Sequence, residues 1–128
     1  EKIIKKSINK KRIITNYEYL DDEKFNDYFF NATYTVLPYR KSFKAQSVVF
    51  TDSVKRFTPL ICSKESQNGY DTENFSLGEV FNSEDINSLE YVIREAYKKW
   101  INKDLPETQN YLNYLSVSSP TNIAKSII

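Results

Sequence analysis

Residues 34–62 read YTVLPYRKSFKAQSVVFTDSVKRFTPLIC and carry the strongest structural signal in the chain. A short β-branched run at 35–37 leads into a proline. A second apolar run at 60–62 follows another proline after a helix-length segment. The pattern predicts a strand, a loop, a helix over about 44–57 and a second strand, which together form a βαβ unit. Because parallel strands bind ligands where strand ends meet helix N-termini, the loop 39–47 is the first candidate site.

The same alternation of strand and helix patterns extends along the chain. Four strands are expected, at 12–15, 34–37, 60–62 and 77–81. Helices are expected at 1–9, at 21–31, over about 44–57 and 87–103, and after Pro106, whereas polar, glycine-containing 63–75 is expected to be a loop. The sequence therefore predicts an α/β, Rossmann-like parallel sheet of about four strands with flanking helices. Residues 1–104 are expected to form this domain and 105–128 a C-terminal helical tail.

Apolar residues at helical spacing mark the expected core of two helices. The first stripe is Phe25, Tyr28 and Phe29, and the second is Leu89, Val92, Ile93, Ala96 and Trp100. Trp100 has two readings, as a core residue or as one covered by a domain outside this chain. The acidic run Asp21, Asp22 and Glu23 is expected to cap a helix rather than to bind magnesium.

Composition excludes several classes of function. The 128 residues carry a net charge of +1, which argues against a nucleic-acid partner. Cys62 is the only cysteine, so no internal disulfide can form, and a reducing, cytoplasmic location is expected. The absence of histidine removes His-based zinc sites and Ser-His-Asp triads. No metal and no cofactor are expected.

Several short motifs in a fixed order resemble one enzyme family. They are ITNYEYLDDEKF at 14–25, VLPYR at 36–40, QS at 46–47 with PLI at 59–61, and LGEVF at 77–81 followed by Asp85 and SL at 88–89. Together they resemble the GT-B-fold nucleotide-sugar glycosyltransferases of bacterial capsule and lipopolysaccharide synthesis. The chain resembles the later part of their C-terminal, donor-binding domain. It also lacks an initiator methionine, and we expect it to be a fragment.

This resemblance implies transfer of a sugar from a nucleoside diphosphate sugar to an acceptor hydroxyl. It also implies an N-terminal acceptor-binding domain outside this chain, so the chain alone is not expected to turn over substrate. For the full-length protein it implies a cytoplasmic location, or peripheral contact with the inner face of the membrane.

Eight residues are implied as donor-binding residues: Ser47, Asp52, Gln46, Arg40, Tyr39, Lys44, Leu20 and Tyr19. The helix N-terminus at 45–48 is expected at the diphosphate. Asp52, seven residues before Pro59, is expected either at the ribose or in an ion pair with Arg56. No catalytic residue is assigned.

Three positions depart from the family pattern. Lys44 stands where the family has an acid, and Val48 and Glu18 stand where it has glycine. These departures favour an alternative function, a non-catalytic interaction module derived from a Rossmann-like domain. A receiver-type regulatory domain is disfavoured, because no expected strand ends in a phosphoacceptor aspartate.

Overall fold

A parallel sheet forms the centre of the protein. The computed structural model describes residues 13, 21–43 and 47–118. Its strands are β1 (Thr35–Leu37), β2 (Leu60–Ser63) and β3 (Gly78–Phe81), hydrogen-bonded in the order β1-β2-β3. Both pairings are parallel. The described residues therefore contain three strands instead of about four, and the strand expected at 12–15 lies outside them except for Ile13.

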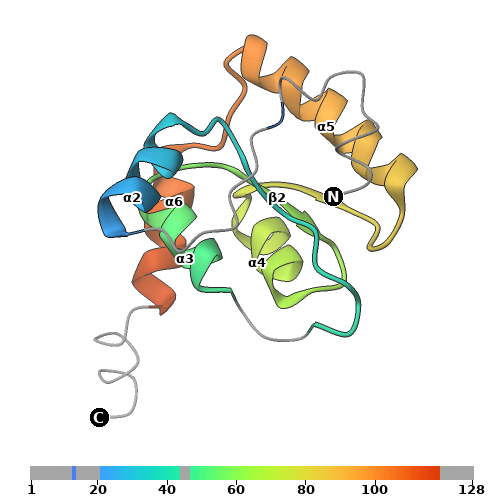
Figure 1. The fold of residues 1–128 in the computed structure, drawn as a ribbon, viewed down its shortest axis with the longest axis horizontal. Helices are drawn as coiled ribbons and strands as arrows, with labels where there is room; N and C mark the ends of the chain where they lie inside the picture. Colours follow the sequence, from blue (N-terminus) through green and yellow to red (C-terminus); the bar gives the residue numbers. More distant parts are fainter. Residues whose placement is uncertain (1–12, 14–20, 44–46, 119–128) are drawn as a thin grey trace.

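Helices cover both faces of this sheet. They are α2 (Asp22–Asn31), α3 (Val48–Lys55), α4 (Gln67–Phe75), α5 (Ile86–Ile101) and α6 (Thr108–Ser118). The connection from β1 to β2 runs through α3, and that from β2 to β3 runs through α4. Helices α3, α4 and α6 lie on one side of the sheet and α5 lies on the other (Figure 1). The expected α/β class is confirmed.

Side-chain caps explain where the helices begin. The carboxylate of Asp21 accepts from the Lys24 amide at 2.9 Å, and that of Asp85 accepts from the Ser88 amide at 3.1 Å. Each satisfies an N–H that has no partner within its own helix. The first of these caps was expected from the acidic run at 21–23. Helix α3 begins at Val48 rather than near 44, because Ser47 is its cap.

The expectation of a loop at 63–75 is wrong, because Gln67–Phe75 forms α4. Its buried side is polar and small, so it lacks the apolar periodicity that marks a helix. Gly69 is not a turn residue there. A Cβ at this position would lie 2.0 Å from the Ser63 carbonyl oxygen, so glycine permits close packing of α4 against the end of β2.

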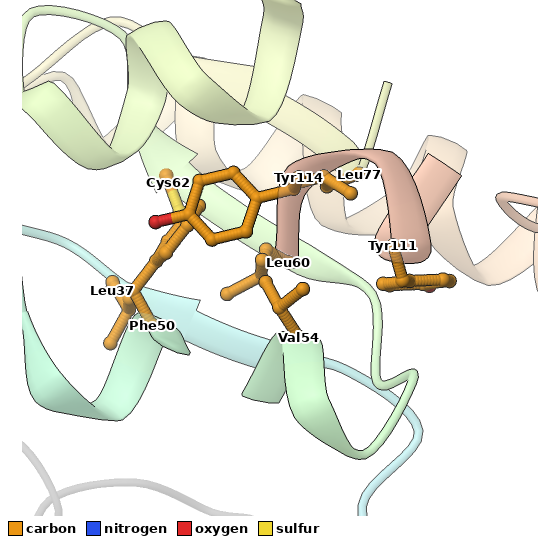
Figure 2. Close-up of a cluster of buried hydrophobic side chains, with 8 residues drawn as sticks. All are labelled: Leu37, Phe50, Val54, Leu60, Cys62, Leu77, Tyr111 and Tyr114. Carbon is orange, nitrogen blue, oxygen red and sulfur yellow. The ribbon is translucent and has the colours of Figure 1, made fainter. Parts of the chain in front are cut away.

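The main core lies between the sheet and the helices α3 and α6. It contains Leu37, Phe50, Val54, Leu60, Cys62, Leu77, Tyr111 and Tyr114, whose side chains converge in Figure 2. Alternate residues of β2 point to opposite faces, so Ile61 packs instead with Phe81 and Ala96 beneath α5. The segment expected as a tail thus contributes two tyrosines to the main core.

Two expectations about the core need correction. On α2, Phe29 is buried, but Tyr28 is half-exposed, so the aromatic stripe is not uniformly internal. On α5, Ala96 is buried, whereas Ile93 and Trp100 are each about half-exposed. In both helices the apolar stripe is wider than the area that packs against the rest of the described chain, so part of it stays exposed.

Candidate functional site

The carboxyl edge of the sheet gathers most of the polar groups that sequence patterns singled out. The strands end there at Leu37, Ser63 and Phe81, and each is followed by a polar loop. Helices α3 and α4 begin at the same edge, capped by Ser47 and Ser66. Parallel topology imposes this arrangement, since each crossover helix returns from the end of one strand to the start of the next.

Ser47 connects the elements that meet at this edge. Its buried hydroxyl accepts hydrogen bonds from the Val49 amide and from the Tyr39 hydroxyl, each at 3.1 Å. Its backbone N–H donates to the side-chain oxygen of Asn68 at 3.2 Å. Because the hydroxyl already accepts twice, its own proton is available to donate. Ser47 therefore joins the β1 loop, α3 and α4.

Asn68 is a site residue that sequence patterns missed. It lies in the first turn of α4 and is fully buried. Within the residues that the structure describes, its Nδ2 has no hydrogen-bond partner. A buried amide without a partner is costly and rare, so it marks this junction of two helix N-termini as unusual. Ser66, a residue type that often caps helices, is the signal that could have indicated a helix here, and no sequence signal links Asn68 to Ser47.

The loops around this junction are held together by further hydrogen bonds. The Ser83 hydroxyl donates to the Tyr39 carbonyl at 2.9 Å, and its amide donates to the Glu65 carboxylate at 2.9 Å. The Tyr39 ring stacks on Phe43, with centroids 4.2 Å apart. Tyr39 is therefore positioned from two sides, by its backbone and by its ring.

Asp52 and Arg40 do not join this network. Asp52 lies five residues after the α3 cap, and its carboxylate is 3.9 Å from the guanidinium of Arg56, the ion pair expected at i, i+4. Arg40 is exposed, and its carbonyl accepts from the Phe43 amide at 3.0 Å. Their contacts with ribose and phosphate stay predictions.

Four other expected site residues lie outside the described residues. They are Tyr19, Leu20, Lys44 and Gln46. The structure thus brings together Tyr39 and Ser47, and it adds Asn68 to them.

The chemistry of this edge suits an anion. Backbone N–H groups at the N-termini of α3 and α4 carry partial positive charge, and Tyr39 and Ser47 supply neutral hydroxyls. Across residues 13, 21–43 and 47–118, no three His, Cys, Asp or Glu side chains are close enough to hold a metal ion. The Cys62 thiol is buried, and burial raises its pKa to about 12, so it is a poor nucleophile.

Comparisons with family models, curated proteins and solved structures found no match. None of the helices in the described segments has the length and apolar character that a membrane span requires. The fold and the polar edge together define an α/β protein whose described residues form a three-stranded parallel sheet with a candidate anion site at its carboxyl edge.

Proposed function

We propose that this chain is the donor-binding part of a glycosyltransferase that uses a nucleoside diphosphate sugar, in bacterial surface polysaccharide synthesis. One observation carries the proposal. The N-terminus of α3 meets that of α4 at the carboxyl edge of a parallel sheet, and the buried side-chain amide of Asn68 at this junction has no hydrogen-bond partner among the described residues. Open parallel sheets bind nucleotides at this edge, with the phosphates at a helix N-terminus.

In this proposal the diphosphate lies at the N-terminus of α3. The first-turn N–H groups and the helix dipole stabilise its charge, and the Ser47 hydroxyl donates its free proton to a phosphate oxygen. Tyr39 holds that hydroxyl in place. Asp52 accepts hydrogen bonds from the ribose hydroxyls, with its charge balanced by Arg56. Sugar transfer itself depends on an acceptor-binding domain outside this chain.

A titration followed by amide NMR tests this proposal. UDP, GDP, ADP and CMP are added separately to the isolated chain. We expect one diphosphate to shift the amides of 47–52 saturably, since these groups face the ligand. Ser47→Ala should weaken the response about 10-fold, equivalent to one charge-assisted hydrogen bond.

Glu95→Ala is the matched control, because Glu95 lies on the opposite side of the sheet, on α5, and pairs with Lys98 at the surface. The control should respond like the unaltered chain. The α3 N-terminus would be rejected as a diphosphate site if no nucleotide shifted the amide signals. It would also be rejected if the shifts were equally large in Ser47→Ala.

The second candidate function is a non-catalytic interaction module. The observation that favours it is a set of exposed apolar side chains, including Phe30 on α2, Val36 on β1 and Tyr97 on α5. Such surface commonly marks contact with another protein. This function predicts no nucleotide response and a stable complex with a protein partner.

A further inference from the structure

A groove lies at the amino end of the sheet, opposite the candidate anion site. Its volume is about 610 Å³, and α2, the turn before β2 and the segment after α5 enclose it. Its lining includes Asn26, Asp27, Phe30, Arg56, Phe57 and Trp100. Strand β2 has four residues, so the two edges lie roughly 10 Å apart. The groove is therefore separate from the candidate anion site.

Three aromatic rings line this groove while remaining open to solvent. Phe30 is 87% exposed, Trp100 is 45% exposed and Phe57 is 44% exposed. They come from three elements: the C-terminal half of α2, the end of α5 and the turn after α3. Exposed aromatic surface that converges on a single groove from separate elements is typical of a binding site rather than of scattered surface residues.

Planar polar groups also line this groove. The Arg56 guanidinium lies over the Phe29 ring, 5.1 Å from its centroid, and donates to the side-chain oxygen of Asn26. It also donates to the Asp52 carbonyl at 3.0 Å. Arg56 is thus held in one orientation, with Asn26 beside it and Asp27 also lining the groove. Amide, carboxylate and guanidinium groups can each engage two neighbouring hydroxyls at once.

The charges in this groove disfavour other ligand classes. A phosphate-bearing ligand is disfavoured, because the charge of Arg56 is already balanced by the Asp52 carboxylate at 3.9 Å and Asp27 adds negative charge. A lipid chain is disfavoured by the same charged groups, which it would desolvate without replacing their hydrogen bonds. A sugar ring combines apolar C–H faces, which pack on aromatic rings, with hydroxyls at its edge. We therefore propose that this groove binds a neutral carbohydrate chain.

This site does not rest on the proposed function, because the groove and the N-terminus of α3 share no residue, although Arg56, which lines the groove, also balances Asp52 in the proposed donor site. A glycosyltransferase would use such a groove to retain a polysaccharide near its catalytic cleft, while a binding module would use it directly. Loss of nucleotide binding in Ser47→Ala and loss of carbohydrate binding in Phe30→Ala are therefore expected to be separable.

Tryptophan fluorescence gives a direct test, since Trp100 is the only tryptophan in the sequence and lines the groove. The chain is titrated with maltohexaose, cellohexaose and mannohexaose, each up to about 10 mM. We expect at least one of these hexasaccharides to change the emission saturably. Phe30→Ala should weaken that binding about 5- to 10-fold, because it removes one stacking surface and its high exposure leaves the fold intact.

Tyr70→Ala is the matched control, since Tyr70 is an exposed aromatic residue on α4 that does not line the groove. It should bind like the unaltered chain. The proposal would be overturned if none of the three sugars changed the tryptophan emission. It would also be overturned if Phe30→Ala bound the sugar as tightly as the unaltered chain. A concentration-dependent dimer that buries Trp100 would overturn it in favour of a second copy of the chain as the occupant.

Discussion

Gly78 begins β3 at a point where the backbone leaves no room for a side chain. Its φ is +154°, and a Cβ there would lie 1.9 Å from the carbonyl oxygen of Leu60, its partner in β2. Gly78→Ala should therefore lower the free energy of unfolding by about 3 kcal/mol or more, since the clash is with backbone in the middle of the sheet. Urea denaturation followed by circular dichroism measures the change.

Ser76→Gly provides the opposite control two residues away. Ser76 caps the C-terminus of α4 with a left-handed φ of 54°, which glycine adopts without strain. The substitution should raise the free energy of unfolding by about 0.5–1 kcal/mol. If both variants left the free energy of unfolding unchanged, neither steric crowding at Gly78 nor backbone strain at Ser76 would affect stability.

Cys62 is a chemical reporter of the main core. Burial raises the pKa of its thiol from an ordinary 9.0 to about 12, although a hydrogen bond with Thr72 partly opposes this. The folded state thus favours the protonated thiol. Its contribution to stability is complete below about pH 9 and is lost as the pH rises toward 12.

We expect Cys62 to resist alkylation by iodoacetamide at pH 8 in the native protein and to react within minutes in 6 M urea. Burial and protonation both suppress the thiolate that reacts. Mass spectrometry of the quenched protein gives the labelled fraction. Rapid labelling of the native chain would mean that β2 opens readily or is not covered by α4.

At the level of the helices, sequence patterns succeed where a cap and an apolar stripe coincide. Asp21 and Asp85 each precede such a stripe, and α2 and α5 are found where expected. Helix α4 was missed because its buried side consists of Asn68, Asp71 and Thr72, so its packing depends on hydrogen bonds and close approach rather than on apolar area.

The candidate site was predictable only in part, for a related reason. Tyr39 and Ser47 flank the same loop, so local sequence places them together at a strand end. Asn68 meets Ser47 from 21 residues away, and its partner is a backbone N–H that any residue could supply. No side-chain pattern can encode such a contact.

The start of α3 should depend on the pair formed by Tyr39 and Ser47. Ser47→Ala removes the cap and should cost about 1 kcal/mol of stability. Tyr39→Phe removes only the hydroxyl that donates to Ser47. A double-mutant cycle should give a coupling energy of about 0.5–1 kcal/mol, the usual net value of one hydrogen bond.

Denaturation of the four proteins in this cycle supplies the coupling energy. Ser53→Ala, combined with Tyr39→Phe, is a suitable comparison, because the Ser53 hydroxyl bonds instead to Thr35 and Thr58. That pair should be additive. Additivity of Tyr39→Phe with Ser47→Ala as well would show that the hydrogen bond does not stabilise the edge.

Across the whole molecule, the two faces of the sheet are covered unequally. Of the described helices, α3, α4 and α6 pack on one face and α5 packs on the other, where the Tyr34 hydroxyl donates to the Ala96 carbonyl at 3.0 Å. Val36, Ile93 and Tyr97 remain exposed beside it. Parallel sheets are normally buried on both faces, so this side is the natural place for further structure to pack.

The well-covered face depends on α6, the last described helix. Its Tyr111 and Tyr114 are buried, and the Tyr114 ring packs against Phe50 and Phe75, with centroids 5.3 Å away in each case.

Losing one large buried aromatic side chain costs about 3–5 kcal/mol, while a whole domain is stable by only about 5–15 kcal/mol. A chain that ends at residue 107 should therefore lose cooperative unfolding, which thermal denaturation by circular dichroism would detect. Leu112→Ala, an exposed change on the same helix, should cost less than about 1 kcal/mol. If the shortened chain kept a sharp transition at the original temperature, α6 would be an appendage rather than part of the core.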